Sequence, residues 1–357
     1  MKYSNNYIFY PDNRALELAI ANSIGMLSEE LAESARPDTK VTVADNFLHT
    51  RGNFEQHRFS SNILETAREA LESALTEEYR EQDPAGWAST QISLGNILGA
   101  LGQQLRDAEL YEKAIQCFNN ALEVYNQDEH PLDWASTQYN MGTAMQALGR
   151  QESDSKLLKA SIDAYTNALL KWTREKMPFE WASTMHQLGA TFHAYGKLLK
   201  GNRNYQKSVV AYKNALAELD ADNYAFELAA THNNRGAVLN HLGESEGNPE
   251  RLEEAIRSYE TGLIVIMEQQ LPFHLAVICR VNKATAQNVL AELTNDAVLA
   301  EEVADEFELI IECFPHVLQP LCLKHCEEQL KKAQSLVKAL LAVTAEIKSA
   351  QKVRTRR

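Results

Sequence analysis

A short motif returns along the chain at a constant spacing of 47 residues. The segment Trp87–Gln91 (Trp-Ala-Ser-Thr-Gln) recurs from Trp134 and, with Met in its last position, from Trp181. Weaker copies begin at Leu228 and Leu275, again 47 residues apart. Because one spacing persists without insertion, the sequence predicts tandem structural units that stack on their neighbours, and not separate globular domains.

Each unit is predicted to hold two helices. In the first clear copy, one runs from the Trp to near Leu101 and the other from about Tyr111 to Tyr125, with apolar and small residues at helical spacing. A glycine after leucine is expected to end each first helix in a left-handed cap. These glycines are Gly102, Gly149 and Gly243. Prolines are expected in the linkers, three residues before each next first helix: Pro84, Pro131, Pro178 and Pro272.

The composition favours helices and an acidic surface. There are only 15 Gly and 9 Pro in 357 residues, few for an α/β enzyme with many turns. The formal charge of −14 argues against nucleic-acid binding, because phosphate contacts need a cationic surface. From Lys331 to Arg357 eight basic residues accompany one acid, Glu346, so the first 330 residues carry −21. The basic end is interpreted as a frayed terminus. The alternatives are an intramolecular contact with the acidic body and docking to an acidic partner or an anionic surface.

Three segments are expected. Residues 1–40 include an amphipathic capping helix from Asp12 to Ala35, residues 41–340 hold about six repeat units, and residues 341–357 form a basic tail. No signal peptide is evident, no stretch approaches the ~20 apolar residues of a membrane span, and five cysteines do not suggest a disulfide scaffold. We therefore expect a soluble, cytoplasmic protein.

Small, aliphatic and aromatic residues hold fixed places in each unit. In the first clear copy they are, in order, Leu94, Gly95, Leu98, Ala114, Phe118 and Ala121. This order resembles the tetratricopeptide repeat (TPR), whose period is about 34 residues. The extra residues are assigned to a longer hairpin loop, between Gly102 and Ala114, and to a longer link between units. A HEAT-like repeat is the competing fold.

The resemblance implies an all-α, TPR-like solenoid, a right-handed superhelix whose first helices line a concave groove. The long-period variant looks similar to repeats of large bacterial signalling and regulatory proteins. Uncharged polar residues in such a groove can pair with a peptide backbone. Candidate partner-binding residues are Asn96, Tyr139, Thr143, Gln146, His186, His193, Asn233, Asn240, His241, Arg280 and Gln287. Arg280 is expected to bind a carboxylate of the partner. The alternative is that all of these are merely solvated helix positions.

A Cys/His run near the C-terminus raises the possibility of a zinc site. Its members are Cys313, His316, Cys322, His325 and Cys326. Cys322 and Cys326 lie 47 residues after Leu275 and Cys279, however, so we predict buried thiols in a helix core and no metal. His186 and His193 share a helix face without an obvious third ligand.

Arg235 replaces the leucine before glycine in its unit. A buried arginine would need a carboxylate, and the alternative is a repeat that diverges toward the end of the array.

The sequence contains no recognised catalytic or phosphate-binding motif. We therefore expect a non-enzymatic scaffold or adaptor, without a cofactor, that binds a peptide or protein in its groove. Homo-oligomerisation stays open. The alternative is a regulatory sensor, in which a small ligand or signalling peptide changes the curvature or the oligomeric state of the array. An enzyme built on the solenoid is the third and least favoured hypothesis.

Overall fold

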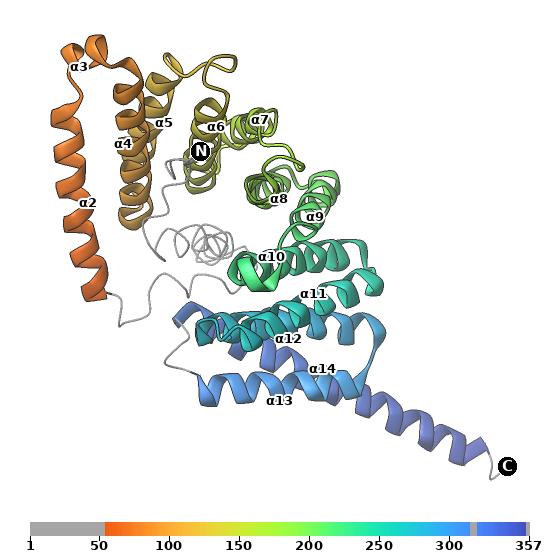
Figure 1. The fold of residues 1–357 in the computed structure, drawn as a ribbon. Helices are drawn as coiled ribbons and strands as arrows, with labels where there is room; N and C mark the ends of the chain where they lie inside the picture. Colours follow the sequence, from red (N-terminus) through yellow and green to blue (C-terminus); the bar gives the residue numbers. More distant parts are fainter. Residues whose placement is uncertain (1–53, 315–319, 355–357) are drawn as a thin grey trace. The chain divides into compact units, whose positions relative to one another are not determined.

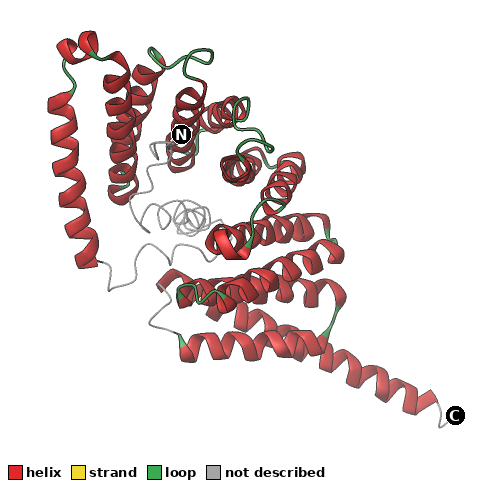
Figure 2. Cartoon of the chain, in the orientation of Figure 1, coloured by secondary structure: helices red, strands yellow, loops and turns green. Residues whose placement is uncertain are grey.

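The computed structural model describes residues 54–314 and 320–354, and within these ranges every regular element is a helix (Figure 2). The chain divides into two compact units, one ending at Leu219 and the other beginning at Asp220. Within each unit, helices pack in pairs that follow the chain order (Figure 1). The predicted all-α class and the paired helices of a helical repeat are confirmed.

The first unit contains three complete helix pairs, preceded by two further helices. The pairs join α4 to α5, α6 to α7 and α8 to α9, and α2 packs against α4. The helices are α2 (Phe54–Ala74), α3 (Glu77–Gln82), α4 (Pro84–Leu105), α5 (Ala108–Leu122), α6 (Pro131–Gln151), α7 (Ser155–Ala168), α8 (Pro178–Leu199) and α9 (Asn202–Leu216).

The second unit continues the same alternation. Here α10 pairs with α11, α12 with α13, and α13 with the first part of a much longer helix, α14. The helices are α10 (Ala221–Glu246), α11 (Pro249–Glu268), α12 (Phe273–Thr294), α13 (Ala297–Cys313) and α14 (Pro320–Arg354). The core between α12, α13 and α14 contains Val281, Phe307, Cys322 and Cys326.

The prediction of a long loop inside each hairpin is wrong. Helix α4 continues to Leu105, and only Arg106 and Asp107 separate it from α5. Arg106 adopts the left-handed conformation (φ 52°), and the Asp107 carboxylate accepts a hydrogen bond from the N–H of Glu109 at 2.9 Å. The same left-handed residue before a helix N-cap recurs at Ser153, Lys200, Gly247 and Asn295. The residues assigned to the loop therefore lengthen both helices of the pair, α4 as far as Leu105 and α5 from Ala108 onward.

Gly102, Gly149 and Gly243 are consequently not helix caps. They lie inside the first helices, where the second helix passes so closely that a Cβ on Gly243 would lie 2.6 Å from Leu252 Cγ. The earlier glycine of each unit faces an aromatic ring instead: the pairs are Gly95 with Phe118, Gly142 with Tyr165, Gly189 with Tyr212 and Gly236 with Tyr259. The repeated glycines are thus required by the close approach of the two helices.

The prolines begin the first helices and do not lie in the linkers. Pro84, Pro131 and Pro178 occupy the first turn of α4, α6 and α8, where a missing N–H costs no intrahelical hydrogen bond. Each of these helices therefore starts three residues before its Trp. Pro272 differs, because it is the N-cap of α12.

Two of the repeated tryptophans carry an arginine over the ring. The guanidinium carbon of Arg80 lies 4.7 Å from the centre of the Trp87 ring, and Arg80 also pairs with Glu123 at 2.7 Å. Arg174 lies in the same way over Trp181, at 5.4 Å, and pairs with Glu218. These contacts attach α3 to α4, and the link after α7 to α8.

The predicted N-terminal capping helix, Asp12 to Ala35, and the rest of residues 1–40 lie outside the described residues. At the other end, α14 continues without a break through residue 341, where the basic tail was expected to begin, as far as Arg354. No helix in the described ranges is both long and apolar enough to cross a membrane.

Candidate functional site

The predicted partner-binding residues all lie on first helices, α4, α6, α8, α10 and α12, but they differ in exposure. Six are half-buried: Asn96, Tyr139, Thr143, His241, Arg280 and Gln287. Five are buried: Gln146, His186, His193, Asn233 and Asn240. The contacts of the two groups show which of them also hold the helices together.

In the first unit, the residues of α6 contact both α7 and α8. The ring of Tyr139 lies against Tyr165 and Trp172, with centroids 5.6 and 5.4 Å apart, and Thr143 Oγ1 lies 3.1 Å from Tyr165 Oη. Gln146 donates from Nε2 to Thr191 Oγ1 at 2.8 Å and to a backbone carbonyl of α8 at 3.2 Å. Gln146 therefore connects one first helix directly to the next.

The two histidines of α8 pack on the aromatic residues of α9. His186 meets Tyr212 edge-on with ring centroids 5.4 Å apart, and His193 meets Tyr205 at 5.6 Å. Burial lowers the pKa of His186 to about 4, because the protonated ring would lose its hydration. At neutral pH this histidine is uncharged and acts as a polar packing residue.

In the second unit, buried amides join α10 to α12. Asn282 donates from Nδ2 to Asn233 Oδ1 at 3.0 Å. Asn240 lies two turns further along the same face of α10, and its buried Oδ1 accepts no hydrogen bond from the described residues. A buried acceptor without a donor costs about 1–3 kcal/mol.

Arg280 already has a carboxylate within its own chain. Its Nε and Nη2 donate to the two carboxylate oxygens of Glu306 on α13, at 2.7 and 2.8 Å. This bidentate pair raises the pKa of Arg280 and occupies the group that was expected to bind a partner's carboxylate. Binding of a partner by Arg280, as by the other ten residues, stays a prediction.

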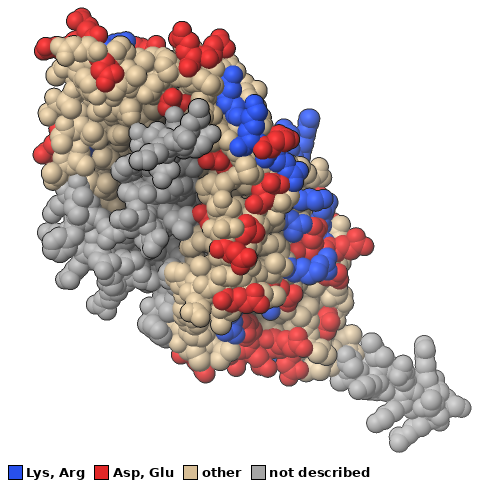
Figure 3. Space-filling model, in the orientation of Figure 1, with Lys and Arg blue, Asp and Glu red and all other residues tan. Residues whose placement is uncertain are grey.

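The first helices of the first unit carry almost no charge. Helix α4 has no charged residue, and α6 and α8 have charges only near their ends, at Asp133, Arg150, Glu180 and Lys197. The second helices α5, α7 and α9 bear charged residues along their exposed faces. Acidic and basic side chains intermingle over the face drawn in Figure 3. In the first unit, charge is therefore concentrated on the second helices, and most polar groups of the first helices are neutral.

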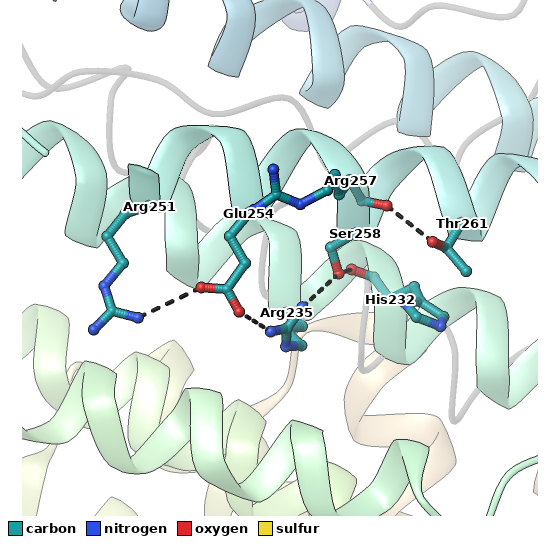
Figure 4. A network of polar contacts seen from close by, with 7 residues as sticks. All are labelled: His232, Arg235, Arg251, Glu254, Arg257, Ser258 and Thr261. Carbon is teal, nitrogen blue, oxygen red and sulfur yellow. Dashed lines mark hydrogen bonds and ion pairs between the residues drawn. The ribbon is translucent and has the colours of Figure 1, made fainter. Parts of the chain in front are cut away.

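Arg235 has the carboxylate that the sequence analysis required of a buried arginine. It forms an ion pair with Glu254 of α11, which also contacts Arg251, and its Nη1 lies 3.4 Å from Ser258 Oγ (Figure 4). Ser258 in turn donates to the backbone carbonyl of His232 at 2.9 Å. The arginine thus joins α10 to α11 through a polar network, at a position where the three preceding units have the apolar residues Leu94, Met141 and Leu188.

The prediction that Cys322 and Cys326 are buried in a helix core is confirmed. Cys322 and Cys326 are fully buried in the core of the second unit, whereas Cys313 is exposed. His325 is buried, with Nε2 3.2 Å from Thr285 Oγ1 of α12. His316 lies outside the described residues. The described residues contain no group of three or more His, Cys, Asp or Glu side chains that could hold a metal ion.

Besides Asn282, sequence reasoning missed Asn288, which also joins successive first helices. Asn288 on α12 donates from Nδ2 to both the backbone carbonyl and Oε1 of Gln329 on α14, at 3.1 and 2.9 Å. It directly follows the predicted groove residue Gln287. Its partner lies 41 residues on, the same separation as between Gln146 and Gln187, which is the signal that could have identified it.

Comparisons with known protein families and with curated proteins find no match to this chain. The proposals that follow therefore rest on the residues and contacts described above.

Proposed function

We propose that this chain is a TPR-like helical-repeat protein that binds an extended peptide segment of a partner protein along its first helices and catalyses no reaction. The observation that carries the proposal is the neutral polar character of α4, α6 and α8 beside charged second helices. Neutral amide, hydroxyl and imidazole groups suit the N–H and C=O groups of an extended peptide, which are themselves uncharged. Such contacts bind peptides without reading much of their sequence.

The two groups of predicted residues have different roles in this proposal. Gln146 and Asn233 use their amides to join successive first helices, so they keep the row of polar residues in register. The half-buried residues, such as Asn96 and Thr143, are those that a peptide can reach.

The test is a selection of short random peptides displayed on phage against the full chain, followed by affinity measurements on the enriched peptides. The binding variant is Asn96→Glu, which places a charge in the neutral row. The matched control is Lys159→Glu on α7, whose side chain is 65% exposed and which lies outside that row. We expect Asn96→Glu to weaken binding by about 10-fold or more and the control by less than about 2-fold.

Two results would contradict the proposal. One is a selection that enriches no peptide, and the other is an equal loss of affinity in both variants. A small molecule that alone raises the melting temperature of the full chain, while no peptide binds, would instead support the sensor hypothesis. Thermal unfolding of both variants, followed by circular dichroism, verifies that each is folded.

A further inference from the structure

Two of the second helices carry charged side chains of a single sign. Helix α9 has three basic residues and no acidic one, whereas α13 has six acidic residues and no basic one. The other second helices, α5, α7 and α11, each carry both signs. A surface of one sign creates a local electric field that attracts groups of the opposite sign. The fields of α9 and α13 are opposite to each other.

The basic residues of α9 lie on its exposed side. The exposed positions follow helical spacing and are Arg203, Gln206, Lys207, Val210 and Lys213. Val210 is 57% exposed and lies in the middle of this side by helical spacing. We call these five residues the basic face; it combines an apolar centre with cations around it.

The acidic residues of α13 form a similar face of opposite sign. The exposed positions, again at helical spacing, are Val298, Glu301, Glu302, Asp305, Glu308, Leu309 and Glu312, and we call them the acidic face. Val298 is 67% and Leu309 43% exposed, so apolar groups accompany the carboxylates here too. In Figure 3 acidic side chains group over α13. The sixth acid, Glu306, pairs with Arg280 and does not belong to this face.

Neither face is neutralised by the rest of the described chain. None of the three cations of the basic face, and none of the five carboxylates of the acidic face, forms an ion pair with another described side chain. Glu308 accepts a hydrogen bond from Gln334 at 2.9 Å, which leaves its charge in place. Opposite charges on another molecule would therefore add new attraction at both faces.

We propose that this chain self-associates by docking the basic face of α9 in one copy onto the acidic face of α13 in a second copy. The two helices have 15 and 17 residues, so they are about 23 and 26 Å long and match in length. Each copy presents both halves of the contact, and no other molecule is needed to complete it. The contact lies on second helices and does not depend on the peptide binding proposed above.

The overall charge of the chain sets the conditions for this contact. Two copies that each carry a formal charge of −14 repel each other at a distance. At about 0.15 M salt this repulsion is screened beyond about 8 Å, whereas charges in contact are screened much less. One helix on one helix is also a small interface, so we expect a dissociation constant of about 10–100 µM.

The experiment is sedimentation equilibrium of the full chain and of two charge-reversal variants. The basic-face variant is Arg203→Glu with Lys207→Glu, and the acidic-face variant is Glu302→Lys with Asp305→Lys. Each has a control that makes the same change in net charge at exposed positions outside both faces. These controls are Lys113→Glu with Lys159→Glu for the basic-face variant and Glu109→Lys with Glu112→Lys for the acidic-face variant.

The wild-type chain should associate at about 0.15 M salt and dissociate at about 1 M salt, where screening acts beyond about 3 Å. Each face variant alone should associate about 10-fold or more weakly, because like charges then meet, and each control should change the dissociation constant by less than about 2-fold. An equal mixture of the two face variants should associate again, because each reversed face meets a face of opposite charge on the other variant. Far-UV circular dichroism establishes that each variant keeps its helix content.

Three results would overturn the proposal. The first is a wild-type chain that stays monomeric up to about 300 µM, whatever part of the same chain then lies against the two faces. The second is an equal loss of association in a face variant and its control. The third is a mixture of the two face variants that does not associate, because the basic face then has a different partner surface.

Discussion

The close approach of paired helices predicts opposite effects for the same substitution at two glycines. Gly189 of α8 faces the fully buried ring of Tyr212, and a Cβ at Gly189 would lie 2.8 Å from two ring carbons and 2.9 Å from a third. Gly99 lies inside α4, where a Cβ would have nothing within 4 Å. Both positions are helical, so alanine brings the same gain in helix propensity, about 1 kcal/mol.

At Gly99 this gain stands alone, and Gly99→Ala should raise the free energy of unfolding by about 1 kcal/mol. At Gly189 the added methyl group overpacks a buried ring, which costs about 1–3 kcal/mol. With three contacts shorter than 3.0 Å the cost should lie near the top of that range, so Gly189→Ala should destabilise by about 2 kcal/mol in net terms. The two variants should therefore differ by about 3 kcal/mol.

The assay is urea unfolding of the full chain, followed by circular dichroism. A double-mutant cycle with Tyr212→Ala identifies the cause, because Gly189→Ala should become neutral or stabilising once the ring is removed. The reasoning is refuted if Gly189→Ala is as stable as Gly99→Ala, or if its cost persists without the ring.

Three further predictions concern polar groups buried within or between the helix pairs. Burial lowers the pKa of His186 from 6.5 to about 4, so as the pH falls the unfolded chain binds this proton before the folded chain does. The contribution of the neutral ring to the free energy of unfolding is therefore complete above pH 6.5 and is lost between pH 6.5 and about 4. His186→Gln should remove this part of the pH dependence of urea unfolding. Arg235→Leu, which introduces the residue found at this position in the units of Leu94 and Leu188, should be neutral or stabilising. Glu254→Ala should destabilise by about 1–3 kcal/mol, because it leaves Arg235 half-buried without its carboxylate, and thermal unfolding of both variants checks the sign. Gln146→Ala should cost about 1–3 kcal/mol by removing the donor to Thr191, and hydrogen exchange should show the loss in α6 and α8 together.

The 47-residue register predicted which residues of the first helices are equivalent, but not which neighbouring residues they contact. The register placed Tyr139, His186 and Asn233 at equivalent positions of successive first helices. The structure adds that Tyr139 and His186 each contact the aromatic residue 26 positions later, on the second helix of the same pair. A repeat pattern identifies equivalent positions, but it does not reveal which neighbouring helix covers them, because that depends on the distance and angle between helix axes.

The sequence by itself determined the all-helical class, the pairing of helices and the buried place of Cys322 and Cys326, since all of these follow from spacing at 3.6 residues per turn and at 47 residues per unit. Only the tertiary structure decided where the first helices end. Leucine-glycine looked like a helix stop, yet the glycines let the second helix approach, and a non-glycine residue such as Arg106 in the left-handed conformation ends the helix instead. The same glycine serves as a cap or as a contact according to what packs on it, and that is a property of the assembled pair and not of the local sequence.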